Sequence, residues 1–174
     1  MILTGPAIAS AVAAGEIVID PFEPERISPN AYDWRLGDRI QWCDGSLDAA
    51  VSSEFSEMAI PADGMVLLPS PLYLGVTHER TCSERYAQMI NGNRTIGGLG
   101  IWVHVSAPLG HVGHAIRWTL EMRVVKPVRI YPYMTFGKII FIATEGSRAS
   151  YQDMGTKYTQ TGGIGVSRLY EELW

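Results

Sequence analysis

The sequence has few charged residues and no excess of basic ones. Only 18% of its 174 residues are charged, and 18 acidic against 14 basic side chains give a net charge of −4. Proteins that bind nucleic acid usually present a positive surface to the phosphate backbone. The composition therefore argues against nucleic acid as a partner.

Cysteine is scarce as well. Cys43 and Cys82 are the only two, and neither stands in a CxxC or HxE spacing, so the sequence does not support a zinc site. The pair could form one disulfide. Two free thiols in a cytosolic protein are the expected state.

Long apolar runs are also missing. No stretch reaches the roughly 18 apolar residues of a membrane-spanning helix, so we expect no membrane partner. The N-terminus, MILTGPAIASAVAAGEIVID, has no basic start, and its apolar run breaks at Gly15-Glu16, unlike a signal peptide. We expect a cytoplasmic protein.

Turn residues, by contrast, are plentiful, with 18 Gly and 10 Pro among 47% apolar residues. This composition suits one globular domain with many short strands. Thr4-Gly5-Pro6 ahead of AIASAVAAG predicts an N-terminal helix, capped by Thr4 and ended by Gly15.

Most of the remaining sequence has the pattern of β-strands. Residues 117–125 alternate most clearly, which predicts a half-buried strand with apolar Trp118, Leu120, Met122 and Val124 on one face and polar Arg117, Thr119, Glu121 and Arg123 on the other. Other candidate strands are residues 17–19, 31–36, 39–43, 64–68, 72–76, 100–105, 128–131 and 138–143. Such closely spaced strands predict a closed or folded-over antiparallel β structure.

The C-terminal residues 145–174 differ from the rest. Gly, Ser, Thr and Tyr dominate there without an apolar period. Such a tail is often ordered only against a neighbour or a ligand.

Several segments resemble one family. Gly15-Glu16-Ile17-Val18-Ile19-Asp20-Pro21-Phe22 and Ser28-Pro29-Asn30-Ala31-Tyr32-Asp33-Trp34-Arg35-Leu36-Gly37-Asp38 are similar to the N-terminal part of dCTP deaminases, which share their fold with trimeric dUTPases. In family order follow INGNRTIGGLGI (90–101), His104-Val105-Ser106-Ala107, Thr119-Leu120-Glu121, and a tail from Lys157-Tyr158 to Ser167-Arg168. The resemblance covers nearly the whole chain.

The resemblance implies a single dCTP deaminase-like domain over residues 1–174. It implies a mainly β fold, a β-clip or distorted jelly-roll-like barrel of the dUTPase type with a short N-terminal helix. It further implies a homotrimer with active sites between subunits, a nucleotide held with Mg²⁺ through its phosphates, and no zinc. The polar tail, residues 145–174, is then expected to close over the nucleotide.

Glu121 matches the family glutamate that activates water for attack on C4 of cytosine. A carboxylate on the polar face of a strand, beside Thr119 and Arg123, suits a general base. The alternative is a surface glutamate paired with Arg123, since charge alternation is common on half-buried strands.

The loop at residues 90–101 departs from the family pattern G-[KR]-S-S-x-[GA]-R-x-G-L. The two serines of the family pattern fall at Arg94 and Thr95 of this chain, and the arginine of the pattern falls at Gly98. Arg94 and Thr95 are candidates to take over the lost roles, although a guanidinium depends on its geometry. The alternative is a glycine-rich turn with a surface arginine. The loop is not a Walker motif, because no Gly-Lys-Ser/Thr ends it.

His111 replaces an aspartate that lies near the sugar in the family. This change suggests altered sugar or base recognition by a pH-sensitive imidazole. His111 and His114 could instead suggest a metal, but no third ligand of suitable spacing accompanies them. The nucleotide contacts expected from the resemblance are Asn93, Gly98, Ala107, His111, Thr119, Tyr151, Lys157 and Thr161.

Three functions follow from these observations. The first is deamination of a cytosine deoxynucleotide, with Glu121 as the base. The second is a related enzyme that hydrolyses a phosphate bond or deaminates a modified or ribo-nucleotide. The third is a nucleotide-binding trimer that has lost catalysis.

Overall fold

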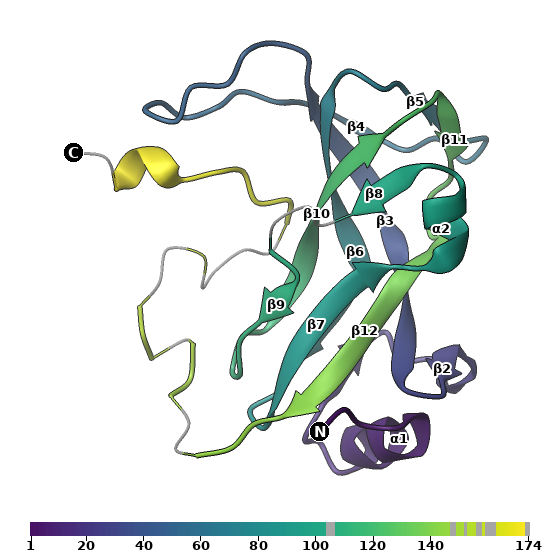
Figure 1. Cartoon of the computed structure of the whole chain (residues 1–174), viewed down its shortest axis with the longest axis vertical. Coiled ribbons are helices and arrows are strands. Elements are labelled where there is room, and N and C mark those ends of the chain that lie inside the picture. Colours follow the sequence, from purple (N-terminus) through teal and green to yellow (C-terminus); the bar gives the residue numbers. More distant parts are fainter. Residues whose placement is uncertain (104–106, 147–148, 152, 156–157, 159–162, 173–174) are drawn as a thin grey trace.

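Strands make up most of the computed structural model, which describes the chain outside residues 104–106, 147–148, 152, 156–157, 159–162 and 173–174 (Figure 1). The elements are α1 (Gly5–Ala13), β1 (Val18–Asp20), η1 (Pro24–Arg26), β2 (Ile27–Ser28), β3 (Ala31–Cys43), β4 (Ser56–Ala59), β5 (Met65–Leu67), β6 (Leu72–Cys82), β7 (Tyr86–Gly92), α2 (Arg94–Gly98), β8 (Ile101–Val103), β9 (Leu109–Gly110), β10 (Ile116–Val124), β11 (Val128–Ile130), β12 (Thr135–Ala143) and η2 (Leu169–Glu171). The mainly β fold expected from the sequence is confirmed.

The strands form one curled antiparallel sheet and one small two-stranded sheet. The large sheet has the order β8-β10-β6-β3-β12-β7-β9, with β1 added to β6 and with β2 and β4 added to β3; β5 pairs with β11. The long strand β3 connects the two halves, because its first part pairs with β12 and its second part pairs with β6. Strand β10 lies between β8 and β6 in this order, so only its two faces are available to other parts of the chain.

The sequence pattern predicted two separate strands, residues 31–36 and 39–43, divided at Gly37-Asp38. That prediction is wrong. The strand runs unbroken from Ala31 to Cys43 and absorbs the glycine in an irregularity of its pairing with β6. A Cβ on Gly37 would lie 2.9 Å from the carbonyl oxygen of Val76. The glycine therefore permits a close approach of two strands and does not make a turn.

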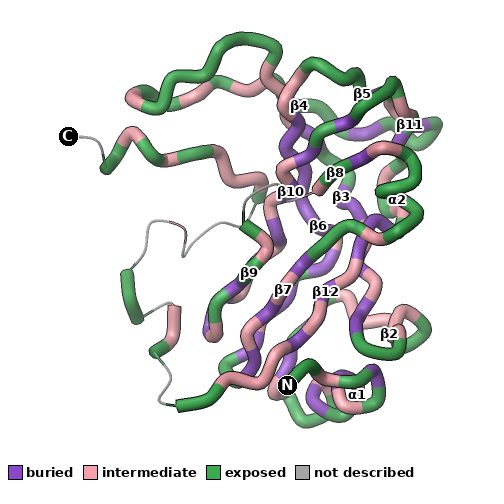
Figure 2. The backbone as a smooth tube through the Cα atoms, in the orientation of Figure 1, coloured by how far each residue is buried: buried purple, intermediate pink, exposed green. Residues whose placement is uncertain are grey.

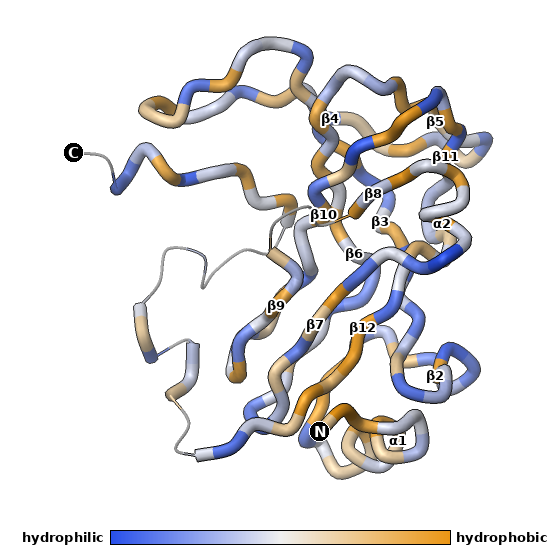
Figure 3. Tube along the Cα trace, viewed as in Figure 1, coloured by the Kyte–Doolittle hydropathy of each residue, from blue (hydrophilic) through white to orange (hydrophobic). Residues whose placement is uncertain are grey.

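The core fills the space between the two halves of the sheet. Figures 2 and 3 show buried and apolar residues recurring along β3, β6, β10 and β12. The largest fully buried side chains include Trp34, Tyr32, Phe136, Phe141 and Leu120. Along β10 the apolar face is buried and the polar face is not, as the alternation predicted.

A buried ion pair joins β3 to β6 at the pairing irregularity. Glu79 is 1% exposed, and its carboxylate accepts hydrogen bonds from the Arg35 side chain (2.7 Å) and backbone nitrogen (2.8 Å). Arg35 also contacts Glu23, at 2.7 Å. Burial opposes the charged form of Arg35, but these carboxylates outweigh it, and the net pKa of Arg35 is raised.

The N-terminal helix forms where it was predicted. Ile8 and Ala11 are buried, and Gly15 takes the left-handed conformation (φ 72°) just past the helix end. Thr4 stands at the N-cap position, but its side chain makes no capping hydrogen bond. The predicted capping by the Thr4 side chain is therefore wrong. Pro6 in the first turn, whose backbone dihedral already suits a helix, remains as the start signal.

Two predictions about absences can be compared with the structure. Cys43 and Cys82 are both free thiols. Within the described residues, no helix has the length and apolar character needed to cross a bilayer.

Candidate active site

A cavity of about 620 Å³ opens along the polar face of β10. Strand β10 contributes Arg117, Thr119, Glu121 and Arg123 to its wall, since alternate residues of a strand share one face. The other walls come from β6, the loop between β3 and β4, the segment around β9, and the C-terminal tail.

Five of the predicted site residues meet in this cavity: Ala107, His111, Thr119, Glu121 and Tyr151. They come from three separate segments, two of which carry no regular structure. Their contacts with a nucleotide stay a prediction. Lys157 and Thr161 were predicted as well, but both lie outside the described residues.

Glu121 occupies the middle of the polar face of β10, between Thr119 and Arg123. It lies opposite Leu74 of β6 in the antiparallel pairing, and Leu74 also lines the cavity. The alternative of an ion pair between Glu121 and Arg123 is not supported, because Arg123 makes no ion pair within the described part of the chain.

The predicted loop residues Asn93, Arg94, Thr95 and Gly98 do not line the cavity of their own chain. They form the short helix α2, which the sequence did not predict, and Figure 1 places it across the sheet from the tail. The side chain of Asn93 accepts a hydrogen bond from the backbone nitrogen of Ile96 at 2.9 Å and so caps this helix. Arg94, Thr95 and Gly98 are exposed.

An aromatic stack forms one end of the cavity. The ring of Tyr151 stacks on the ring of His111, with centroids 5.0 Å apart and an angle of 11° between the planes. It also contacts the His114 ring, which is tilted relative to it, with centroids 4.4 Å apart. The backbone nitrogen of Tyr151 donates to the carbonyl of Val112 at 3.0 Å. The tail is therefore attached to the segment that carries both histidines.

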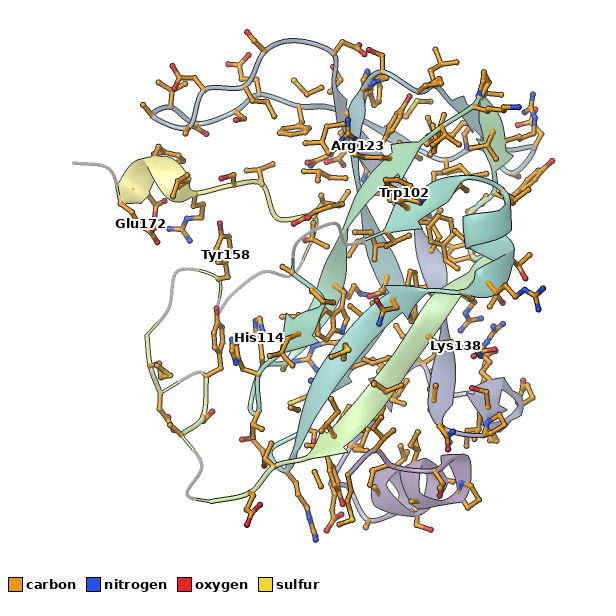
Figure 4. The ribbon with its side chains drawn as sticks, viewed as in Figure 1. Trp102, His114, Arg123, Lys138, Tyr158 and Glu172 are labelled. Carbon is orange, nitrogen blue, oxygen red and sulfur yellow. The ribbon has the colours of Figure 1, made fainter. Side chains whose placement is uncertain are left out.

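His114 is the more buried of the two histidines, at 8% exposure. Its Nε2 lies 3.2 Å from the carbonyl oxygen of Tyr158, and Figure 4 shows both residues beside β9. Burial lowers the pKa of His114, an effect only partly opposed by the Tyr158 carbonyl. Burial therefore favours the neutral imidazole.

A second attachment brings the tail to β10 itself. The backbone nitrogen of Gly165 donates a 2.9 Å hydrogen bond to the hydroxyl of Thr119, and Val166 and Ser167 line the cavity beside it. The backbone nitrogen of Arg168 donates to the Tyr158 hydroxyl at 3.0 Å. These contacts attach the described part of the tail to its own chain, and the closing of the tail over a nucleotide stays a prediction.

A buried hydrogen-bond chain supports the histidine segment from behind. Trp118 Nε1 donates to the hydroxyl of Thr81 (2.9 Å), which donates to Gln88 Oε1 (2.6 Å). Gln88 Nε2 then donates to the carbonyl of His114 at 3.4 Å. The ring of Trp118 packs against Gly110. A Cβ added to this glycine would lie 2.1 Å from the ring. These contacts fix the cavity wall relative to β10.

The two arginines of the cavity differ in their surroundings. Arg117 Nη1 donates to the backbone carbonyls of Thr77, at 3.3 Å, and His78. Arg123 has no hydrogen-bond partner in the described residues, and Figure 4 places it near the end of β10 that lies away from His114 and Tyr158.

Sequence reasoning missed part of the cavity. Leu47, Ser53 and Phe55 come from the loop after β3, whose last residue Cys43 pairs with Leu72. No spacing in the sequence connects that loop with β10. Arg123 was on the predicted polar face beside Glu121, and that alternation was the signal for its place in the cavity.

The protein itself offers no metal cage in the described residues. Nowhere in that part of the chain do three His, Cys, Asp or Glu side chains gather as a metal site would require. A Mg²⁺ ion in the cavity would take most of its ligands from water or a bound molecule, since Mg²⁺ usually takes few protein ligands.

Comparisons with known proteins identify the family of the chain. A family model described as dCTP deaminase-like matches residues 2–144. The chain is 37% identical over 174 residues to the dCTP deaminase of Rhodopirellula baltica, covering 99% of this chain and 86% of the relative. It is 38% identical over 174 residues to "dCTP deaminase, dUMP-forming" of Cytophaga hutchinsonii, covering 99% of both.

Among solved structures, the fold resembles the 2′-deoxycytidine 5′-triphosphate deaminase of Agrobacterium tumefaciens, with a TM-score of 0.66 at 17% identity. The match covers 82% of this chain and 48% of that one, so it spans about half of the solved chain. At this identity the likeness concerns the fold. The family match and the full-length relatives show that this chain belongs to the dCTP deaminase-like family.

Proposed function

We propose that this protein deaminates a cytosine deoxynucleotide hydrolytically, with dCTP as the first candidate substrate and Glu121 as the general base. One observation carries the proposal: Glu121 lies in the wall of a nucleotide-sized cavity, next to Thr119, where the tail returns to β10. The names of the full-length relatives support the same reaction.

The reaction needs one water and one base. Glu121 takes a proton from water while the water oxygen bonds to C4 of the cytosine ring, and the electrons of the C4–N3 double bond move to N3. Glu121 then returns the proton to the amino group, which leaves as ammonia when the C4–N3 double bond re-forms. Transfer of the remaining hydroxyl proton to N3 gives the uracil nucleotide.

The closed tail keeps bulk water from the reacting ring. Thr119 holds Gly165, and the stack of His111 on Tyr151 holds the start of the tail. Such closure strengthens the electrostatic interactions inside the cavity and limits side reactions.

Mg²⁺ would arrive with the nucleotide, bound by its phosphates and by water. It would neutralise phosphate charge, and it takes no part in the proton transfers of Glu121. Lys157 and Thr161 are the tail residues expected to meet the phosphates.

The position of α2 supports a shared site in a homotrimer. Arg94 and Thr95 are exposed and lie away from the cavity of their own chain. We propose that they complete the cavity of a neighbouring subunit, in the place of the family's catalytic loop. Sedimentation should then give a stable trimer, and a stable monomer would contradict the shared site.

A second candidate is deamination coupled to release of diphosphate. The relative from Clostridium botulinum, 36% identical over 174 residues, is named "dCTP deaminase, dUMP-forming", as is the one from Cytophaga hutchinsonii. If this chain shares that activity, dCTP yields ammonia, diphosphate and dUMP in equal amounts.

The deciding experiment is a panel of cytosine nucleotides, ribo and deoxy, from mono- to triphosphate, with Mg²⁺. Ammonia release that disappears in Glu121→Gln supports the proposal. Release from a ribonucleotide alone would assign altered sugar recognition to His111. Phosphate or diphosphate release without ammonia would indicate a phosphohydrolase, and tight binding without turnover would indicate an inactive nucleotide-binding trimer.

A further inference from the structure

The walls of the cavity are apolar around Glu121. Leu74 lies opposite Glu121 in the pairing of β6 with β10, and Leu72 lies opposite Cys43, where the loop after β3 begins. Both leucines line the cavity, as does Phe55 from that loop. A pyrimidine ring suits such walls, whereas a charged phosphate would lose its hydration there. The base therefore belongs at Glu121, as the proposed reaction also requires.

Strand β10 shows how far from Glu121 the rest of a bound nucleotide extends. Thr119 and Arg117 follow on the same face, and both line the cavity. At about 3.3 Å per residue, Arg117 lies about 13 Å along the strand from Glu121. With the base at Glu121, the sugar lies beside Thr119 and His114. The span to Arg117 is then bridged by the atoms that connect the base with the β- and γ-phosphates.

Arg117 is held in place by the backbone of β6. Its Nη1 donates hydrogen bonds to the carbonyls of Thr77, at 3.3 Å, and His78. Its Nε and Nη2 make no hydrogen bond or ion pair within the described part of the chain. The side chain is half-buried. A phosphate would therefore meet a guanidinium that is already oriented and partly desolvated, which reduces the cost of binding.

The charges around Arg117 favour an anion. Arg80 of β6 lies directly opposite Arg117 in the strand pairing, so the two side chains share one face of the sheet. Like charges in opposite positions destabilise a sheet. Asp20 of β1 lies opposite Arg80 on its other side, but neither arginine forms an ion pair among the described residues. A phosphate would supply the negative charge that this pair lacks.

We propose that Arg117 is a specificity-determining residue, which binds the β- or γ-phosphate and makes the protein select di- and triphosphates over monophosphates. The inference rests on the proposed function for the place of the base at Glu121. A guanidinium binds phosphate oxygens through paired hydrogen bonds that an uncharged side chain cannot replace. These phosphates take no part in the proton transfers at Glu121, so Arg117 affects KM more than kcat.

Binding and turnover of dCTP and dCMP, measured with Mg²⁺, test the proposal. In Arg117→Gln, KM for dCTP should rise about 10- to 100-fold, because hydrogen bonds to a charged group are lost, while kcat changes less than about threefold. The KM for dCMP should change less than about threefold, since dCMP has no phosphate that reaches Arg117. The dissociation constants of both nucleotides from Glu121→Gln, with and without Arg117→Gln, give the same comparison without turnover.

Arg129→Gln is the matched control. Arg129 also donates from Nη1 to two backbone carbonyls, those of Asp63 and Gly64, both at 3.1 Å, but it is exposed and lies outside the cavity. This variant should keep the wild-type affinity for both nucleotides. Arg117→Lys keeps the charge without the planar fork and should lose part of the preference for dCTP. If Arg117→Gln does not fold, Arg117→Lys carries the test, and an unchanged preference overturns the proposal.

The outcomes separate this inference from the proposed function. An equal loss of affinity for dCTP and dCMP in Arg117→Gln, or no loss for dCTP, overturns the role of Arg117. The deaminase proposal then stands if wild type releases ammonia. If wild type releases no ammonia from any cytosine nucleotide, the deaminase proposal fails, while a loss of binding in Arg117→Gln that is specific to dCTP still supports the phosphate site.

Discussion

The backbone nitrogen of Gly165 donates a 2.9 Å hydrogen bond to the hydroxyl of Thr119. This single contact ties the C-terminal tail to the strand that carries Glu121, two residues further along the cavity wall. The tail and strand β10 are thereby coupled by a contact within one chain.

Replacing Thr119 by Val should loosen the tail, because Val keeps the shape but accepts no hydrogen bond. A net loss of about 0.5–1.5 kcal/mol corresponds to a few-fold to tenfold weaker closure. Hydrogen exchange at the Gly165 amide should accelerate, and KM for the nucleotide should rise by a similar factor. Thr144→Val, which removes an exposed hydroxyl bonded to the Arg85 carbonyl, is the control. Unchanged exchange at Gly165 would contradict the coupling.

Replacing Gly110 by Ala should destabilise the fold. The new Cβ would lie 2.1 Å from the buried ring of Trp118, which has no room to move. Overpacking of this kind costs about 1–3 kcal/mol in the free energy of unfolding. Gly97→Ala is the matched control, since its Cβ meets open space in helix α2. Urea denaturation should rank Gly110→Ala below wild type and Gly97→Ala at or above it, and the reverse order would refute the packing argument.

Replacing Glu79 by Gln should be strongly destabilising. It removes one charge of a buried ion pair and leaves Arg35, which is mostly buried, with only Glu23. Breaking such a pair typically costs about 3–5 kcal/mol. Glu57→Gln makes the same chemical change in the exposed Arg39–Glu57 pair and should have little measurable effect. Equal effects of the two substitutions in urea denaturation would mean that burial of the pair is not what matters.

The stability of the protein should fall as the pH drops below about 6.5, the ordinary pKa of histidine. Burial lowers the pKa of both His114 and His78 in the folded chain. The unfolded chain then binds more protons than the folded chain, so the free energy of unfolding rises with pH in this range. The full contribution is present above about 6.5 and is lost on acidification toward the folded pKa values.

Urea denaturation at several pH values between about 7.5 and 5 measures this effect. His114→Gln should flatten the pH dependence, and adding His78→Gln should flatten it further. Glu23 and Glu57, whose pKa values are lowered by arginine and glutamine hydrogen bonds, act only below the ordinary carboxyl pKa of 4.5. An equally steep dependence in the double variant would show that other groups are responsible.

The strand with Glu121 was predictable because half-burial imposes the alternation seen from Trp118 to Val124. Helix α2 was not predictable. Its five residues are too few to show a helical period, and apart from Arg94 they are glycines or β-branched residues. Only the Asn93 cap marks its start. Gly37 was read as a turn, although its role is a close approach to Val76. A single sequence contains no signal that distinguishes these two uses of glycine.

The candidate site was predictable where a family motif marked it, as at Glu121, His111 and Ala107. Phe55 and Leu47 were not predictable, because their place depends on where the loop after β3 folds in space. The hydrogen-bond chain from Trp118 to His114 was also hidden, since it passes through Thr81 and Gln88, which no pattern in the sequence relates to that segment.

The central claim is that Glu121 drives hydrolytic loss of the amino group from a cytosine nucleotide. Ammonia released from dCTP with Mg²⁺ by wild type and by Glu121→Gln tests it most directly. The account predicts release by wild type in proportion to the uracil nucleotide formed, and none above background from the folded variant. Equal release by both proteins, or none by wild type with any cytosine nucleotide, would contradict it.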